Sequence, residues 1–146
     1  MPIDETERQR RRTLVQAHMD AENARDLEAI MATFSADAQL LLNGVPVTTP
    51  DALRQFHVLG GMTAQPGALL GTRVLPEREH ITDDEIVIEG RLAGQHVGPF
   101  FGMPPTNAMI ELFYTAIYRF DTAGKLASEC VTMNWGPLDA QWKPQS

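Results

Sequence analysis

The sequence predicts an α+β fold, with helices first and long antiparallel strands after them. Two observations predict this class. Apolar residues recur at helical spacing up to about residue 60, and they alternate with other residues along extended segments in the second half. That order of elements favours α+β over a wound parallel sheet. The 146 residues contain neither an internal repeat nor a linker, so residues 1–146 are expected to form one domain.

Three helices are expected, over residues 6–23, 26–34 and 50–60. Asp26 stands where it can cap the second helix, and Pro50 can open the third at its first position. The expected apolar faces are Leu14, Ala17, His18 and Ala21 on the first helix, Leu27, Ile30, Met31 and Phe34 on the second, and Ala52, Leu53, Phe56 and Leu59 on the third.

Strands follow the second helix and fill the rest of the chain. They are expected over residues 37–43 and 45–47, between 68 and 80, around 86–92, over 110–120, and from 126 to about 135. Asn43-Gly44 is a tight-turn pair, and residues 121–125 form a hairpin turn. One curved sheet wrapped around the early helices would give a cone with an internal cavity.

Charge and composition exclude several function classes. The chain has 12 basic and 19 acidic residues and a net charge of −7, so no basic stripe is available for nucleic acid. No apolar run approaches the length of a membrane span, and the charged N-terminus lacks an apolar signal segment. Cys130 is the single cysteine, so no intrachain disulfide can form. These features predict a cytoplasmic protein without a membrane or nucleic-acid partner.

A segment in the second half carries a family resemblance. Residues 94–106 read Gly-x-His-x-Gly, a short link, and then Gly-x-Pro-Pro-Thr, which resembles the signature of the SnoaL-like polyketide cyclases. Residues 21–27, the hairpin that follows the signature, and Gln141 also match that family's layout, so the resemblance covers nearly the whole chain.

The resemblance implies an NTF2-like cone, a dimer or tetramer, and neither a metal nor an organic cofactor. The best-known members of the family close rings in aromatic polyketides by intramolecular aldol condensation. Others isomerise, hydrolyse epoxides or assist cycloadditions, so the fold alone does not settle the reaction. Family members usually pair through the outer surface of the sheet, so the resemblance implies a homodimer. The position of Phe113 and Ile117 on the strand face opposite Tyr114 and Tyr118 agrees with this, since an apolar outer face needs cover.

One departure from the family concerns its acid–base pair. The aldol cyclases use a His in the penultimate strand and an Asp in the last strand. The resemblance places Ala116 at the first position and Val131, within about a residue, at the second. Neither side chain can transfer a proton, so the usual pair is missing.

Four other residues are candidates for catalysis: His18, His96, Tyr114 and Glu129. His18 lies on an apolar helix face, where an imidazole can either pack with a hydrogen bond or transfer protons near neutral pH. His96 belongs to the signature and can either anchor the loop or orient a substrate oxygen. Tyr114 can stabilise an enolate or simply pack in the core. Glu129 would have a raised pKa if buried, whereas at a strand end it would be solvated.

The phase of the last strand decides which side chains enter the cavity. One phase places Glu129, Val131, Met133 and Trp135 inward. The other places Cys130, Thr132 and Asn134 inward, and Asn134 could then donate a hydrogen bond to a substrate carbonyl. The expected substrate-binding residues are Phe34, Phe56, Met62, Phe100, Ala116, Tyr118, Val131, Met133 and Asn134.

Other chemistries lack a signature. The histidines at positions 18, 57, 80 and 96 have no spacing suggestive of zinc, so no metal is expected. No phosphate loop, dinucleotide fingerprint or Gly-x-Ser-x-Gly elbow is present.

Three functions remain. The first is a cofactor-free cyclase that acts on an apolar, polyketide-like intermediate, by an aldol or pericyclic route, mainly by holding the substrate in a reactive shape. The second is a non-catalytic small-molecule-binding protein. The third is an isomerase or hydrolase with Glu129 or His18 as the base. An enclosed pocket with two or more inward polar groups would favour an enzyme, and a filled cone would exclude both catalytic functions.

Overall fold

The computed structural model describes residues 2–100 and 102–134. It confirms the three helices: α1 spans Glu5–Ala24, α2 Leu27–Thr33 and α3 Pro50–Leu59. The predicted cap is also confirmed, since the Asp26 side chain accepts a hydrogen bond from the Ala29 N–H at 3.0 Å.

Six strands follow the expected order. They are β1 (Phe34–Leu42), β2 (Val45–Val47), β3 (Leu69–Ile81), β4 (Glu85–His96), β5 (Met109–Phe120) and β6 (Leu126–Met133). They form one sheet in the order β2-β1-β6-β5-β4-β3. The expectation of an antiparallel sheet is correct for every neighbouring pair except one, because β1 and β6 are parallel. These two strands are far apart along the chain, so no hairpin forces them to run in opposite directions.

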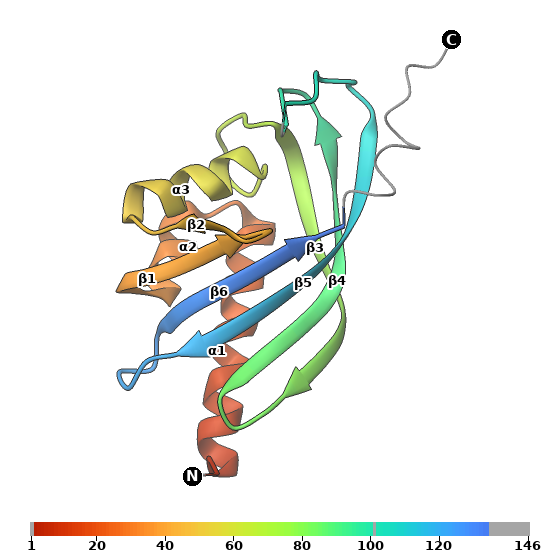
Figure 1. The fold of residues 1–146 in the computed structure, drawn as a ribbon. Helices are drawn as coiled ribbons and strands as arrows, with labels where there is room; N and C mark the ends of the chain where they lie inside the picture. Colours follow the sequence, from red (N-terminus) through yellow and green to blue (C-terminus); the bar gives the residue numbers. More distant parts are fainter. Residues whose placement is uncertain (1, 101, 135–146) are drawn as a thin grey trace.

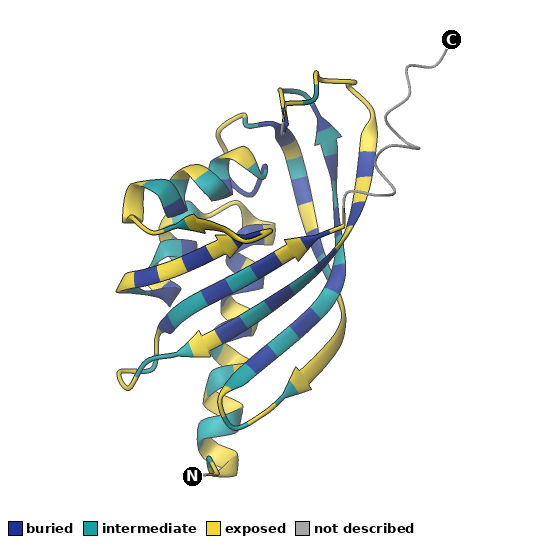
Figure 2. Ribbon diagram, in the orientation of Figure 1, coloured by how far each residue is buried: buried dark blue, intermediate teal, exposed yellow. Residues whose placement is uncertain are grey.

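The sheet curls, and the three helices lie on one side of it (Figure 1). Burial alternates along the strands, and most clearly along β4, where every second residue is buried (Figure 2). The buried residues of β4, β5 and β6 form the inner face of the sheet. The core therefore lies between this face and the helices, as the cone predicted.

Each helix face differs from the prediction in part. On α3, Leu59 is exposed and His57 is buried with Leu53. On α1, Ala17 is exposed, and the buried residues are Val15, His18, Met19, Ala21 and Glu22. The contact face is thus rotated, so that a carboxylate enters the core. Phe34 is the first residue of β1 rather than the last of α2, because its extended backbone already pairs with Leu126 of β6.

Two asparagine side chains fix the elements around the core. The Asn23 amide donates to the Val74 carbonyl at 3.1 Å and accepts from the Val74 N–H at 2.7 Å, which ties the end of α1 to β3. Asn43 makes the same pair of bonds to Met133, at 3.2 and 2.7 Å, which ties the β1–β2 turn to the end of β6. Both asparagines satisfy a backbone N–H and a backbone carbonyl of one residue, and they thereby fix α1 against β3 and the β1–β2 turn against β6.

The outer face of the sheet carries exposed apolar side chains, including Phe113 at 52 % exposure. This agrees with the predicted strand phase, and the homodimer stays a prediction. Among the described helices, none has the length and apolar character needed to cross a bilayer. Trp135 and Gln141 lie outside the described residues.

Candidate functional site

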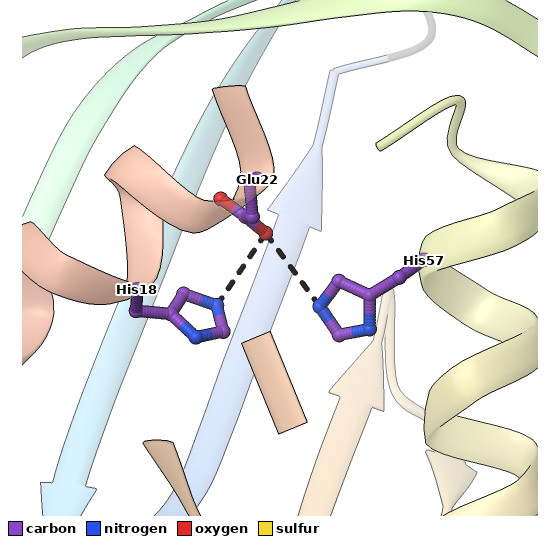
Figure 3. Close-up of side chains that lie close together, drawn as sticks. All are labelled: His18, Glu22 and His57. Carbon is purple, nitrogen blue, oxygen red and sulfur yellow. Dashed lines mark ion pairs between the residues drawn. The ribbon is translucent and has the colours of Figure 1, made fainter. Parts of the chain in front are cut away.

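A cluster of buried polar side chains lies between the helices and the sheet. His18 and Glu22 come from α1, His57 from α3 and Glu129 from β6, and each is at most 3 % exposed. Figure 3 shows the two imidazoles on either side of the Glu22 carboxylate. Ionisable groups are rarely buried so completely unless they are paired, so this cluster is the first place to look for chemistry.

The hydrogen bonds of His18 fix its tautomer. Its Nδ1 lies 2.8 Å from the Thr33 hydroxyl oxygen, and that hydroxyl donates its own proton to the Ile30 carbonyl at 2.6 Å. The Thr33 oxygen can therefore only accept from His18, so Nδ1 carries a proton. The Nε2 atom of His18 then faces the carboxylates.

His57 is oriented in the same way. Its Nδ1 lies 2.7 Å from the Leu53 carbonyl oxygen, which can only accept, so Nδ1 again carries the proton. Its Nε2 points at the same Glu22 oxygen as the Nε2 of His18. The two rings also contact each other edge to face, with centroids 5.8 Å apart.

The distances within the cluster define its electrostatics. His18 Nε2 lies 3.4 Å from Glu22 Oε1 and 3.6 Å from Glu129 Oε2, and His57 Nε2 lies 3.6 Å from Glu22 Oε1. Burial opposes the charged form of His18, but the carboxylates of Glu22 and Glu129 raise its pKa above 6.5. Burial likewise opposes the charge on Glu22, yet His18 and His57 lower its pKa to about 2. Both shifts favour the charged forms of Glu22 and His18.

The pKa of Glu129 is shifted in the opposite direction from that of Glu22. Burial raises its pKa above the ordinary 4.5, and the neighbouring charge of Glu22 adds to the effect. Tyr118 hydrogen-bonds to the Glu129 carboxyl group, and burial raises the pKa of Tyr118 well above 10. Since the cluster already contains one carboxylate, the second has the greater tendency to hold a proton.

Strand register places two polar residues next to the positions of the missing pair. Ala116 and Val131, where the resemblance leads us to expect His and Asp, are directly opposite each other on β5 and β6. Two residues along each strand, on the same inner face, Tyr118 is opposite Glu129. Polar groups therefore occupy the neighbouring cross-strand position.

Two small adjoining cavities lie in the core, and the first of them borders Tyr118 and Glu129. The first is bordered by Glu22, Phe56, Met62, Val74, Leu92, Tyr114, Tyr118, Glu129, Val131 and Met133. The second is bordered by Leu42, Phe56, Leu59, Gly60, Met62, Leu69, Leu92, Phe100 and Met133. Each has about 10 Å³ of room for the centre of a water molecule, close to the least that one water needs. Both cavities, as bordered by the described residues, are therefore small, and the first has four inward polar side chains.

The phase of β6 places Glu129, Val131 and Met133 inside. Asn134 is exposed on the opposite side, so it is not part of the cavity wall, and that expectation is corrected. Of the other expected pocket residues, Phe56, Met62, Phe100 and Tyr118 border the cavities. Ala116 and Phe34 are buried but border neither, and Phe34 packs edge-on against the His18 ring at 5.1 Å.

The remaining catalytic candidates occupy different places. Tyr114 borders the first cavity, and its hydroxyl is buried without a hydrogen-bond partner among the described residues. His18 stands behind Glu129 and borders neither cavity. His96 lies at the end of β4, where its Nδ1 accepts from the Thr106 N–H at 3.1 Å, so it holds the Pro-Pro-Thr loop.

Glu22 and His57 were not among the residues singled out from the sequence. Glu22 follows His18 by one helical turn, and this i, i+4 spacing was the available signal that the two share a face. His57 gave no such signal, because only the packing of α3 against the core brings it to Glu22. His18, Glu22 and His57 form a compact group whose ligand atoms lie within 4.8 Å of one another. The spacing of the histidines along the chain gave no sign of this group.

Residues 15–129 match the SnoaL-like domain family. Among solved structures, an assigned SnoaL-like polyketide cyclase from Jannaschia sp. CCS1 is 17 % identical, with a TM-score of 0.79 and 94 % of each chain covered. AclR from Streptomyces galilaeus, an assigned hydroxylase, is 19 % identical, with a TM-score of 0.76 and 93 % of this chain and 97 % of AclR covered.

A third similar structure is SalBIII, an epoxide hydrolase/cyclase-like enzyme in pyran ring formation in the polyether salinomycin. It is 16 % identical, with a TM-score of 0.69 and coverage of 87 % of this chain and 92 % of SalBIII. At these identities the likeness shows the NTF2-like fold. No curated protein matches the sequence.

Proposed function

This chain belongs to the SnoaL-like domain family, and we propose that it is an enzyme that moves protons during ring closure or rearrangement of an apolar, polyketide-like small molecule. The observation that carries the proposal is the cross-strand pair of Tyr118 and Glu129, which lies at the wall of an apolar cavity with His18 behind it. The assigned cyclase and SalBIII share the fold and support the substrate class.

Glu129 is the proposed catalytic base and acid. Its carboxyl group borders the cavity, and Oε2 has no hydrogen-bond partner among the described residues. A carboxylate in such surroundings is a stronger base than one in water, because its charge is poorly solvated. Tyr118 positions the carboxyl group from the facing strand, and His18 positions it from α1 at 3.6 Å.

Tyr114 is the proposed hydrogen-bond donor to the substrate. Tyr114 borders the same cavity, and burial raises the pKa of its hydroxyl above 10, so it stays protonated. A neutral hydroxyl aimed at a carbonyl oxygen stabilises the negative charge that develops there when a neighbouring proton is removed. The two groups together provide a base and an oxyanion partner.

The proposed ring closure conserves its protons. The Glu129 carboxylate removes a proton from the carbon next to a ketone, and Tyr114 stabilises the enolate oxygen. The enolate carbon then bonds to a second carbonyl carbon of the same molecule, and the alkoxide formed takes the proton back from Glu129. If the proton returns to a different carbon instead, the same groups perform an isomerisation.

The small size of the two cavities favours proton transfer over catalysis that depends only on the shape of a preformed pocket. Catalysis by shape requires a pocket that is already formed when the substrate binds. Each cavity here has about 10 Å³, which is room for one water molecule. A substrate must therefore displace side chains. Met62 and Met133 border both cavities, and their flexible thioether chains are suited to that movement.

Deuterium exchange tests the proposal without the natural substrate. The bicyclic ketone 2-tetralone is incubated with the protein in D₂O, and loss of the protons next to its carbonyl is followed by NMR. Wild-type protein is expected to accelerate exchange, and Glu129→Gln to lose about 10²–10⁴-fold of that acceleration. Glu89→Gln, which changes a glutamate on β4 that pairs with His80, serves as the matched control.

A contrary result would favour the non-catalytic binding protein. If 2-tetralone raises the thermal midpoint, so that it binds, and exchange stays at the buffer rate, the acid–base proposal is wrong. Equal exchange by wild type and Glu129→Gln would likewise exclude Glu129 as the base.

A further inference from the structure

Two buried imidazole nitrogens converge on one carboxylate oxygen. The Nε2 atoms of His18 and His57 lie 3.4 and 3.6 Å from Glu22 Oε1 (Figure 3). Both nitrogens are buried, and neither has a hydrogen-bond partner among the described residues. These separations are longer than a good N–H···O hydrogen bond, so neither imidazole forms a close hydrogen bond to Glu22.

The opposite nitrogen of each ring is already committed. Nδ1 of His57 donates to a backbone carbonyl, and Nδ1 of His18 donates to a hydroxyl whose proton is used elsewhere. Metal-binding histidines are oriented in this way, because the outer hydrogen bond fixes the tautomer and points the other lone pair at the ion. Each ring therefore presents an Nε2 lone pair toward Glu22 Oε1 when that Nε2 atom carries no proton.

We propose that His18, Glu22 and His57 form a binding site for a divalent transition-metal ion of the zinc class. Two imidazoles and one carboxylate are the donor set that suits Zn²⁺, Co²⁺ and related ions, whereas Mg²⁺ and Ca²⁺ prefer oxygen ligands. The three ligand atoms lie within 4.8 Å of one another.

The spacing is close to what such an ion requires. Metal–ligand bonds of about 2.0–2.1 Å place two ligands of a tetrahedral ion about 3.3 Å apart. The two distances to Glu22 Oε1 exceed this by only a few tenths of an ångström. The two Nε2 atoms lie within 4.8 Å of each other, so the rings would also have to move toward each other to complete the site.

The fourth position would face the cavity. Glu22 borders the first cavity, together with Tyr114 and Glu129, whereas the two imidazoles lie behind it. Three protein ligands with an open position toward a cavity leave room for a water or a substrate oxygen. The site goes beyond the proposed function, and its test needs no turnover.

Zinc titration of the untagged full-length protein is the direct test. The protein is stripped with a chelator, which is then removed, and ZnCl₂ is added in a calorimeter. One ion per chain is expected, with an increase in the thermal midpoint. CoCl₂ serves as a second probe, because its visible absorption reports tetrahedral coordination.

Variants separate this site from surface binding. His57→Asn keeps a donor for the Leu53 carbonyl but lacks the Nε2 ligand, and it should weaken Zn²⁺ binding by more than the 10- to 100-fold typical of losing an outer-sphere partner. His80→Asn is the matched control, because His80 is an exposed histidine that is also paired with a glutamate. It should leave binding unchanged.

The proposal is overturned if the folded wild-type protein shows no saturable Zn²⁺ binding, which needs no variant. It is also overturned if His80→Asn removes the binding and His57→Asn does not. Failure here is distinct from failure of the proposed function, because Glu129→Gln should remove the acceleration of proton exchange and keep Zn²⁺ binding.

Discussion

His18 and His96 are both fully buried histidines, yet they stand in opposite environments. At the centre of the cone, the Nε2 atom of His18 faces two carboxylates, and its pKa is raised. At the end of β4, Nδ1 of His96 accepts a backbone N–H from Thr106, and burial lowers the pKa of His96. The first ring is suited to carry charge behind Glu129, and the second is suited to stay neutral and hold a loop.

The comparison teaches that burial alone does not identify a functional histidine. Both residues were candidates for catalysis, and both have an exposure of 0 %. They differ in which groups face the ring nitrogens, and this is set by neighbouring elements. Changes in the two regions should therefore affect different properties.

The largest expected difference is in activity. Glu129→Gln at the centre should reduce 2-tetralone exchange by about 10²–10⁴-fold, because the amide cannot accept a proton. His96→Gln should change the exchange rate by less than about tenfold, since His96 borders neither cavity. Exchange rates by NMR at one pH check both, and a greater loss in His96→Gln would break the comparison.

The next effect is on stability. Glu22→Gln removes the closest carboxylate from the buried His18, whose pKa that carboxylate raises, and it should reduce the free energy of unfolding by about 3–5 kcal/mol. The urea midpoint measures this loss. Glu28→Gln, on the exposed pair with Arg54, is the control and should leave the midpoint nearly unchanged. Equal effects would mean that the central ion pair is not formed.

A smaller effect separates the two histidines by pH. The pKa of His96 is lower in the folded state than its ordinary 6.5, so the unfolded chain takes up the proton first. The stability contributed by neutral His96 is present above about pH 6.5 and is lost as the pH falls below it. His18 has the opposite sign, with a contribution that is present below about pH 6.5 and is lost as the pH rises through its raised value.

Urea unfolding of wild type and His96→Gln, with a chelator present, tests this dependence. The advantage of wild type over the variant should shrink between about pH 7.5 and 5. An advantage that grows as the pH falls would show that His96 is charged in the folded state.

The smallest effect is expected in the loop itself. The Thr106 hydroxyl lies 3.2 Å from His96 Nδ1 and accepts from the Ala108 N–H at 3.2 Å. Thr106→Ala should cost about 0.5–1.5 kcal/mol, the worth of an ordinary hydrogen bond. A thermal midpoint equal to that of wild type would show that the backbone bond alone holds the loop.

Periodicity predicted most of the fold because local spacing reports which face is buried. The strand over Val45–Val47 and the end of β5 at Phe120 were placed to the residue, and α1 differs by one residue at each end. Phe34 was misplaced because an aromatic residue suits the end of a helix stripe as well as the start of a strand. The parallel pairing of β1 with β6 has no local signal at all.

The sequence by itself determined the class of fold, the family signature, the candidates His18, Tyr114 and Glu129, and the missing pair at Ala116 and Val131. Only the tertiary structure decided that Tyr118 and Glu129 face each other on the inner side, that Asn134 does not, and that His57 meets Glu22. The physical reason is that a pKa, a tautomer or a ligand set depends on distances of a few ångströms between side chains of α1, α3 and the sheet. Residue spacing along the chain does not encode those distances, which are fixed only when the elements pack together.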